Sequence, residues 1–460
     1  MKHHVVKALL GIVLASFMFQ GYQCASPEFT GAKVYINQKN YKEAIRMLEI
    51  EVQKNPKNEE AWYYLGSLRG DEGNYEAMNK AFEEALKLSE KHASEIRAIR
   101  YNHWGQSLNA GVSYLEKASS DSAQYFEKAI DYFRRSIEAW PDTALTYRYL
   151  GYAYYNKGDY DSALTAFQQA WDMGKDVESI KRVGRIYIMK GDNHKSRFEE
   201  ANAEPLRLLK NLTEVRRSTQ RNDMMQLLGP PDSTVRGPRG TRKEDWIYGK
   251  YKLTISIDGD KVVDRKFGQP PYTPRVDSSE YRLAQEQYAK ADNALELARA
   301  ADPKDTETLQ ALLKAYVESN RIEQAITEFE KEVKNSSENK QDHYILGVLY
   351  RTAGRFDDAV VQFKEVLRID PNDCDTKFDL AATYYNWGVD IIHEAEDKAE
   401  QTVAYKPKFE AALPYMEQVI ECKKDDPNIW ETLGQIYARL GQQDKAMNAF
   451  QQADKVRKGQ

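Results

Sequence analysis

The side chains with the most distinctive chemistry in this sequence are three cysteines, Cys24, Cys374 and Cys422. A thiol can be acylated, oxidised to a disulfide or bound to a metal. No Cys-x-x-Cys pattern is present, and His393–Glu394 lacks the second histidine that a zinc-binding helix needs. We therefore expect no metal, which leaves acylation and disulfide formation as the chemistry of these thiols.

Paired carboxylates are the other candidates for chemistry. Asp357–Asp358 and Asp425–Asp426 could exchange protons with a substrate, but they stand at predicted helix starts or turns, where the helix dipole favours acidic residues. The stretch "GPPDSTVRG" lacks the lysine of a phosphate-binding loop, and no Gly-x-Ser-x-Gly elbow occurs. The sequence therefore predicts a protein that is not an enzyme and has no cofactor, no catalytic residue and no small-molecule substrate.

The first residues, "MKHHVVKALLGIVLASFMFQGYQC", have a basic start and an apolar run from Ala8 to Phe19. Because this run is too short to span a bilayer comfortably, it is typical of an export signal. Cys24 stands where a bacterial lipoprotein signal places its lipidated cysteine, although Gly21 and Gln23 replace the usual leucine and small residue. We predict lipidation at Cys24.

A lipidated chain would lie on the periplasmic face of the outer membrane, held by an N-terminal lipid anchor. The alternatives are a periplasmic protein or one anchored by an uncleaved N-terminal segment, with Cys24 incidental. Cys374 and Cys422 lie near the two ends of one predicted helix pair. A disulfide needs Cα atoms within about 7 Å, and the unequal helix lengths there favour buried free thiols.

The charge balance excludes one class of partner. Lys and Arg number 66 against 71 Asp and Glu, a net charge of −5 at pH 7. Nucleic acid is therefore not an expected partner, since its phosphates demand a basic surface.

A period of 34 residues organises most of the chain. The spacing is W-x₂-L-G-x₂-Y…A-x₃-F, as in Tyr147, Leu150, Gly151, Tyr154, Ala163 and Phe167, and again in Trp430, Leu433, Gly434, Tyr437, Ala446 and Phe450. The pattern resembles the tetratricopeptide repeat. The resemblance implies pairs of antiparallel helices that stack into a solenoid, with small residues at the helix crossings and large ones filling the gaps between pairs.

Two repeats are stretched in the same way. Gly105 precedes Ala129 by 24 residues, and Gly388 precedes Ala412 by 24, where a regular repeat has 5. The order of units is short, short, long, short in both halves, which indicates a duplicated block. The stretched pairs are either contact surfaces or packing elements.

Residues 211–269 interrupt the helical pattern. The segment predicts a three-stranded antiparallel meander, because apolar and polar residues alternate from Tyr251 through Leu253 and Ile255 to Ile257. A short helix with Met224, Met225, Leu227 and Leu228 is expected to cover it. "LLGPPD", "WIYG" and "IDGDKVVD" resemble the BamE-like (SmpA/OmlA) lipoprotein module of the machinery that assembles outer-membrane β-barrels.

The predicted fold class is mainly α: two tetratricopeptide solenoid blocks flanking a small α+β module. The expected domains are a signal peptide at 1–24, a solenoid at 25–210, the BamE-like module at 211–269, a linker at 270–279 and a second solenoid at 280–460.

By analogy with the family, the first helix of each repeat lines a concave peptide-binding face. Expected peptide contacts there are Arg148, Tyr152, Tyr155 and Asn156 in the first block, and Phe378, Tyr385 and Asn386 in the second. In the module, Arg236, Arg239, Arg242 and Lys243 could contact phosphate or an acidic partner, or form a solvated loop.

These features predict a scaffold in the cell envelope that binds other envelope proteins or peptides. Outer-membrane protein assembly is the most specific hypothesis. The alternative is a general periplasmic adaptor for secretion or cell-wall complexes, with the small module only structural.

Overall fold

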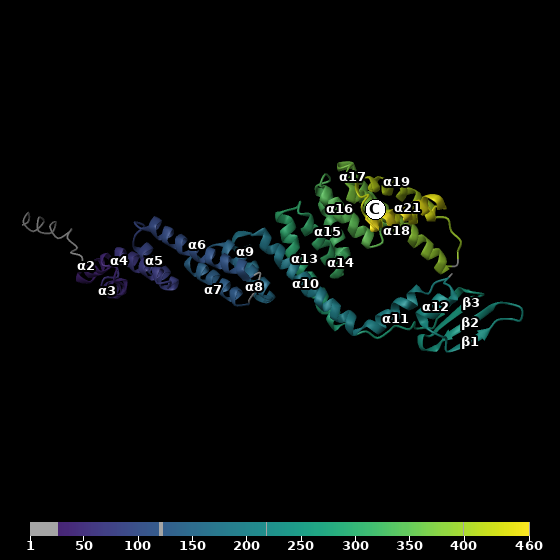
Figure 1. The fold of residues 1–460 in the computed structure, drawn as a ribbon, viewed down its shortest axis with the longest axis horizontal. Coiled ribbons are helices and arrows are strands. Elements are labelled where there is room, and N and C mark those ends of the chain that lie inside the picture. The colour runs from purple at the N-terminus through teal and green to yellow at the C-terminus, as the bar shows by residue number, and fades with distance from the viewer. Residues whose placement is uncertain (1–25, 119–122, 218, 399, 460) are drawn as a thin grey trace, which may run out of the picture. The chain divides into compact units, whose positions relative to one another are not determined.

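The computed structural model describes residues 26–459, except 119–122, 218 and 399 (Figure 1). The described chain is mainly α-helical and contains a four-stranded antiparallel sheet. It divides into two compact units, Met1–Ser179 (unit 1) and Ile180–Gln460 (unit 2). Cys24 and the predicted signal lie outside the described residues.

Unit 1 consists of antiparallel helix pairs, visible in Figure 1. The pairs are α2 (Pro27–Asn37) with α3 (Tyr41–Lys54), α4 (Glu59–Asp71) with α5 (Tyr75–Leu88), α6 (Ala93–Ala118) with α7 (Ala123–Ala139), and α8 (Ala144–Lys157) with α9 (Tyr160–Gly174). Asn40, Asn58 and Asn74 begin α3, α4 and α5, each accepting a hydrogen bond from the amide three residues later.

The helices of a pair cross where a glycine meets a phenyl ring. A Cβ added to Gly66 would lie 2.5 Å from the Phe82 ring, and one added to Gly151 would lie 2.6 Å from the Phe167 ring. Both rings are fully buried. The prediction that small residues occupy the crossings is confirmed at these positions.

The long pair of unit 1 crosses at a glycine that the repeat spacing did not single out. A Cβ at Gly105 would meet no atom within 4 Å, whereas one at Gly111 would lie 2.5 Å from the Phe133 ring. The helices therefore cross at Gly111. Gly105, which the spacing matched with the glycine before the second helix of a regular repeat, lies inside α6, because this helix continues without interruption to Ala118.

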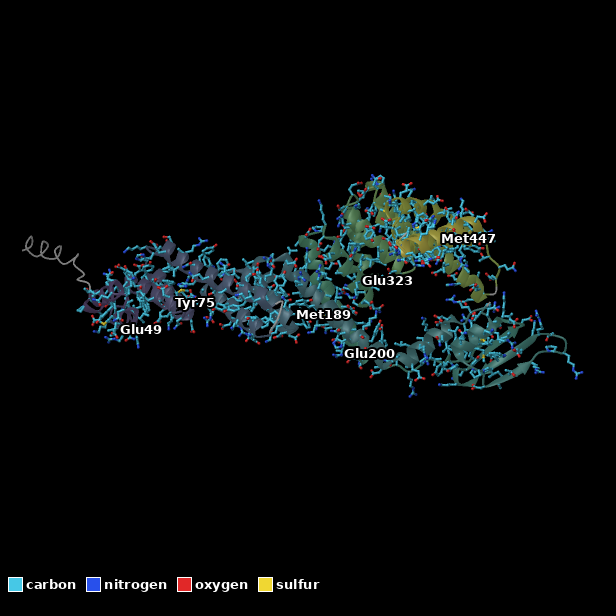
Figure 2. The ribbon with its side chains drawn as sticks, in the orientation of Figure 1. Glu49, Tyr75, Met189, Glu200, Glu323 and Met447 are labelled. Carbon is cyan, nitrogen blue, oxygen red and sulfur yellow. A yellow bond between two sulfur atoms is a disulfide. The ribbon has the colours of Figure 1, made fainter. Side chains whose placement is uncertain are left out.

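The first half of α6 packs on the preceding pair. Tyr75 of α5, labelled in Figure 2, has its ring centroid 5.5 Å from that of His103 and its hydroxyl 3.4 Å from Ser107 Oγ. Ile96 is buried in the same apolar cluster. The first half of α6 thus packs on α5, and the part of α6 that pairs with α7 follows it in the sequence.

Unit 2 contains the remaining helices. They are α10 (Val177–Ala201, which begins in unit 1), α11 (Ala203–Glu214), α12 (Arg221–Leu228), α13 (Ser279–Ala301), α14 (Thr306–Glu318), α15 (Ile322–Asn335), α16 (Lys340–Thr352), α17 (Phe356–Ile369), α18 (Cys374–Lys398), α19 (Lys406–Cys422), α20 (Pro427–Arg439) and α21 (Gln443–Arg457). The long pair α18–α19 has 25 and 17 residues, against 26 and 17 for α6–α7. The order of helix lengths expected from a duplicated block is therefore present.

Helix α10 packs against α13, although 77 residues separate them. A Cβ on Gly184 would lie 2.5 Å from the Leu295 side chain, and one on Gly191 would lie 2.7 Å from the Tyr288 ring. Leu295 thus takes the place that phenylalanine holds opposite Gly66 and Gly151. The sheet module is therefore inserted between the two helices of a single repeat-like pair. The sequence did not predict the pairing of α10 with α13, because the two helices are far apart in the chain.

The sheet has strand order β1-β2-β3-β4, formed by β1 (Ser233–Arg236), β2 (Lys243–Tyr248), β3 (Leu253–Asp258) and β4 (Lys261–Phe267). The prediction of three strands is wrong by one. β1 has no apolar alternation, because all its residues are exposed, and so the pattern gave no signal for it. Tyr251 lies in the 3₁₀ turn η1 (Gly249–Tyr251) instead of extending β3.

The apolar face of the sheet is covered as expected by α12 and, in addition, by α11. Met224 is fully buried against Trp246 and Ile255, while Met225 is 38% exposed and contributes little. Leu212 of α11 joins the same cluster. The module therefore buries its own apolar face without the solenoid helices.

Asp292 of α13 is a buried carboxylate between α14 and α15. Its Oδ2 accepts hydrogen bonds from Ser319 Oγ at 3.0 Å and from Arg321 Nη1 at 2.9 Å. Its Oδ1 is buried and has no partner among the described residues. Burial raises the pKa of Asp292 to about 6, even though Ser319 and Arg321 act to lower it.

We predict opposite effects for two alanine substitutions on α6. Gly111→Ala should lower the free energy of unfolding by about 1–3 kcal/mol, because the new methyl group would overlap the buried Phe133 ring. Gly105→Ala meets no atom within 4 Å and should raise it by up to about 1 kcal/mol through helix propensity. Urea denaturation of the matched variants measures both, and equal effects would contradict the register.

We predict a pH-dependent effect of Asp292→Asn. The folded-state pKa of about 6 lies above the unfolded value of about 3.9. The protonated carboxyl therefore stabilises the fold below about pH 4, and this stability is lost as pH rises through about 6. Relative to the Asn variant, the free energy of unfolding of the wild type should fall by roughly 2–3 kcal/mol between pH 4 and pH 7. Parallel denaturation profiles over that range would contradict this prediction.

Candidate functional site

The peptide-binding residues predicted on α8 are largely engaged within unit 1. Arg148 Nη1 donates to Asp176 Oδ1 at 2.8 Å, and the Tyr152 hydroxyl donates to Glu178 Oε1 at 3.3 Å. Both side chains are half-buried. Arg148 and Tyr152 therefore hold α8 to the chain that follows α9.

Of the other predicted peptide contacts, some contact residues of the same chain and two are exposed. Tyr155 packs edge-on against Tyr160 with centroids 5.5 Å apart, and the Tyr385 hydroxyl donates to Gln435 Oε1 at 2.8 Å. Phe378 is half-buried, and Lys423 Nζ lies 5.9 Å from its ring centroid. Asn156 and Asn386 are exposed.

The basic residues of the module lie together on the loop between β1 and β2. Arg236 ends β1, Lys243 begins β2, and Arg239 and Arg242 stand between them; all four are exposed. The structure thus brings this predicted cluster to one hairpin.

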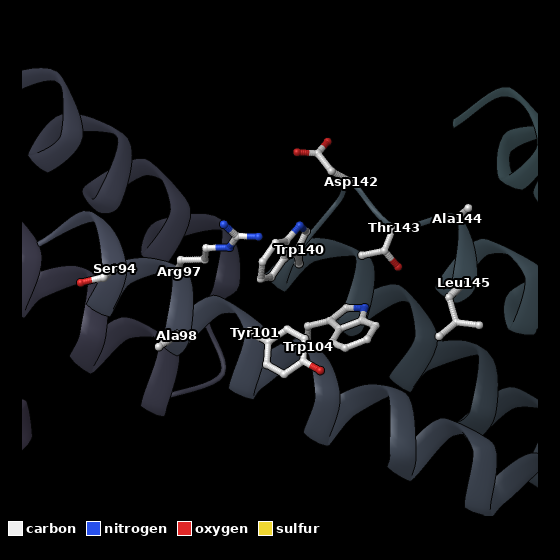
Figure 3. A pocket seen from close by; sticks show the side chains of 10 residues that line it. All are labelled: Ser94, Arg97, Ala98, Tyr101, Trp104, Trp140, Asp142, Thr143, Ala144 and Leu145. Atoms are coloured by element: carbon white, nitrogen blue, oxygen red, sulfur yellow. The ribbon is translucent and has the colours of Figure 1, made fainter. Parts of the chain in front are cut away.

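A recess in unit 1 was not identified from the sequence. It has a volume of about 620 Å³ and lies between the first half of α6 and the chain from Trp140 to Leu145. Figure 3 shows Tyr101 beside Trp104, and Arg97 pointing toward Trp140. We call the recess bounded by Arg97, Tyr101, Trp104, Trp140 and Asp142 the aromatic recess.

The aromatic recess exists because α6 is longer than its partner. α6 has 26 residues and α7 has 17, and Ser136 Oγ donates to the Trp104 carbonyl at 3.1 Å, so the last turn of α7 is level with Trp104. Residues of α6 before Trp104 therefore extend past the end of α7. Trp140 follows α7 directly and closes only one side of the uncovered face.

The aromatic side chains of the recess are held in place by their contacts. Trp104 Nε1 donates to Thr146 Oγ1 at 2.8 Å. The Tyr101 ring lies 5.1 Å from Trp104 and 5.9 Å from Trp140, edge-on to the latter. Tyr101 is nevertheless 59% exposed. The recess thus presents a pre-arranged aromatic surface to solvent.

Charged groups flank these rings. The Arg97 guanidinium carbon lies 5.9 Å from the Trp140 ring centroid, and Asp142 is exposed at the opposite rim. One turn along α6, burial lowers the pKa of Arg100 from its ordinary value. The recess can therefore hold an apolar or aromatic side chain with polar groups beside it.

The long pair of unit 2 is packed differently at the matching position. Cys374 and Cys422 form a disulfide with Cα atoms 6.6 Å apart, which fixes the start of α18 to the end of α19. Tyr384 stands three residues before Trp387, as Tyr101 stands three residues before Trp104. It is 9% exposed and stacks on Tyr415. The prediction of free thiols, which rests on the unequal helix lengths, is therefore wrong, because the start of α18 and the end of α19 lie close enough for the bridge.

Other features found in the described residues are limited. No group of three or more His, Cys, Asp or Glu side chains there could hold a metal ion. Among the helices of the described segments, none combines the length and the hydropathy needed to cross a membrane.

Comparison with known proteins identifies the repeats. The tetratricopeptide repeat family matches residues 29–93, 121–176 and 311–373, and a second form of the same repeat matches 427–459. The repeats predicted from the 34-residue period are therefore confirmed in these ranges. Tetratricopeptide repeat proteins bind other proteins or peptides.

Individual relatives are distant. A TPR repeat-containing protein of Methanocaldococcus jannaschii is 21% identical over 438 residues, which cover 93% of this chain and 69% of that protein. Anaphase-promoting complex subunit 3 of Schizosaccharomyces pombe is 21% identical over 169 residues, covering 36% of this chain and only 23% of that protein. Two solved structures of MamA align at 19% and 20% identity with TM-scores of 0.28 and 0.29, covering 40% and 38% of this chain and 97% and 86% of theirs.

We predict that removing the disulfide destabilises the long pair of unit 2. Because the bridge closes a separation of 48 residues, the double variant Cys374→Ser, Cys422→Ser should lose about 4 kcal/mol of unfolding free energy. Denaturation by urea measures the loss. The wild type under a thiol reductant is the matched control, and it should reach the same stability as the double variant. A reductant without effect would contradict the assignment of the bridge.

Proposed function

We propose that this chain is an exported, non-enzymatic scaffold that binds partner proteins, and that the aromatic recess of unit 1 is one of its docking points. The single observation that carries the proposal is the pre-arranged set of exposed Tyr101 and half-buried Trp104 and Trp140. Tyrosine, tryptophan and arginine are the residues that dominate binding energy at protein interfaces.

The size and chemistry of the recess favour a side chain of a partner protein. A volume of about 620 Å³ exceeds that of one large apolar side chain, so an adjoining stretch of backbone would fit as well. Arg97 is exposed, and no ion pair joins it to another described residue. An acidic or carbonyl group of the partner, next to the docked side chain, could therefore accept a hydrogen bond from Arg97 without displacing another residue of this chain.

Export is supported by two independent features of the chain. The N-terminal pattern resembles a lipoprotein signal that ends at Cys24. The Cys374–Cys422 disulfide is of a kind that persists in oxidising compartments such as the periplasm and is rare in the cytosol. We place the scaffold at the periplasmic face of the outer membrane through lipidation of Cys24.

The finer form of the proposal is a role in outer-membrane protein assembly. Its support is the resemblance of residues 211–269 to the BamE-like module. The alternative, a general envelope adaptor with a structural module, has its own support: α11 and α12 cover the apolar face of the sheet within the chain, so this face is not available to a partner.

We predict that a photo-crosslinking amino acid in place of Tyr101 captures a partner in cells. Tyr101 is 59% exposed and lies inside the aromatic recess. The control position is Tyr41, 45% exposed at the start of α3 and outside the recess. With Cys24 intact, we expect a discrete adduct in the envelope fraction from position 101 and none from position 41.

A second substitution makes the crosslinking test specific. Trp140→Ala removes one wall of the aromatic recess and should reduce the adduct at position 101 at least tenfold while the chain remains folded. Equal capture at both positions, or an adduct that is indifferent to Trp140→Ala, would contradict the recess as a docking point. Recovery of the chain in the cytoplasmic fraction would contradict export.

A further inference from the structure

We propose that the outer edge of β1 binds an acidic, extended segment of a partner protein as a fifth strand of the sheet. The inference deepens the proposed scaffold function, on which it rests, by naming a second surface and the chemistry of its partner. It concerns the module of unit 2 and does not involve the aromatic recess.

The backbone of β1 has unpaired groups along its outer edge. β1 is the first strand in the order β1-β2-β3-β4 and pairs only with β2. Gly237 N donates to the Lys243 carbonyl at 2.8 Å, so in an antiparallel ladder residues 235 and 233 also bond toward β2. Thr234 and Arg236 then direct their N–H and C=O groups outward, where a further strand would pair.

The opposite edge of the sheet is different. Gln220 forms a bridge with Lys261, and Val262 N donates to the Thr219 carbonyl at 2.9 Å. The register also shifts between Ser256 and Ile257 on β3, which distorts the pairing with β4. The chain before α12 therefore occupies the start of the β4 edge. Within the described residues, nothing lies over β1, whose four side chains are all exposed.

The end of the β1 edge carries unpartnered positive charge. No ion pair or side-chain hydrogen bond joins Arg236, Arg239, Arg242 or Lys243 to any residue that the structure describes. Other arginines of the module are paired, since Arg217 contacts Asp264 at 2.8 Å and Arg221 contacts Glu244. Asp258 lies opposite Lys243 in the register, and no ion pair joins them.

The acidic residue that faces Arg236 is already engaged elsewhere. Glu244, opposite Arg236 in the register, accepts from Arg221 Nη2 and from Trp246 Nε1, the latter at 2.9 Å. The next residue of β2, Asp245, accepts from Ser256 Oγ at 2.6 Å. These two carboxylates are therefore not free to neutralise the four cations. Carboxylates of a bound strand would neutralise them.

The open backbone edge of β1 and the four unpaired cations together indicate the class of partner. A phosphate-bearing membrane surface could neutralise the cations, but it offers no backbone to pair with Thr234 and Arg236. A polypeptide strand satisfies both, because its main chain supplies affinity and its acidic side chains supply specificity. Val235 is 54% exposed and adds an apolar contact for a β-branched neighbour.

The test uses the full-length protein and a capped seven-residue peptide of alternating Glu with Val or Thr. A twin peptide with Lys in place of every Glu is the matched control. Hydrogen exchange of residues 232–242 is followed by mass spectrometry. We expect the acidic peptide to slow exchange of two amides, those of Thr234 and Arg236, at least tenfold, and the Lys twin to leave exchange unchanged.

Two sets of variants separate the backbone from the charges. Thr234→Pro removes an outward N–H and should weaken peptide binding at least tenfold, whereas Thr234→Val keeps the N–H and should bind as the wild type does. Arg239→Glu with Arg242→Glu, at exposed loop positions, should abolish binding. This charge reversal keeps the test valid even if Thr234→Pro disturbs the sheet.

Other outcomes overturn the proposal. Peptide binding without slower exchange at Thr234 and Arg236 would mean electrostatic attraction alone. Binding to vesicles with about one-third phosphatidylglycerol, but not to the peptide, would identify a lipid surface instead. Edge protection that depends on protein concentration without peptide would identify a second copy of this chain. Failure here leaves the crosslink at Tyr101 unaffected, so the two proposals fail separately.

Discussion

The close crossing of a glycine with a phenyl ring is the contact on which the architecture depends. At Gly66, Gly151, Gly347 and Gly434, an added Cβ would lie 2.5–2.7 Å from a ring of the partner helix. At each of these four crossings, the two helices leave no room for a side chain in place of the glycine. A pair so formed still exposes one apolar face, and only the next pair can bury it. Local sequence thus fixes the geometry of one repeat, and stacking buries the face that a single pair leaves open.

The position of the crossing along a helix determines which part of its surface the partner helix leaves exposed. In α6–α7 the crossing at Gly111 leaves the first half of α6 beyond the end of α7, and the aromatic recess forms there. In α18–α19 the disulfide holds the corresponding helix ends together, and Tyr384 is buried against Tyr415. Two pairs of nearly equal length therefore carry different surfaces. Tyr101 is therefore exposed in α6, whereas Tyr384 is packed at the matching position of α18.

The same contact explains how a sheet is accommodated in a helical chain. Gly184 meets Leu295 as glycines meet phenylalanines elsewhere, so α10 and α13 form a pair despite the module between them. A helix hairpin tolerates a long insertion in its connection, because loop-closure entropy grows slowly with length. The module has its own core from α11, α12 and the sheet. It therefore adds the open edge of β1 without disturbing the stack.

The sequence by itself determined the repeats and the core of the sheet, because each depends on local periodicity. Tertiary structure alone decided the partner of α10, the crossing at Gly111 and the Cys374–Cys422 bridge. These depend on distances between residues far apart in the chain, which spacing does not encode. The fourth strand was missed because its exposed residues need no apolar pattern. Arg148 and Tyr152 were expected to meet a ligand, but stacking provided their partners within the chain.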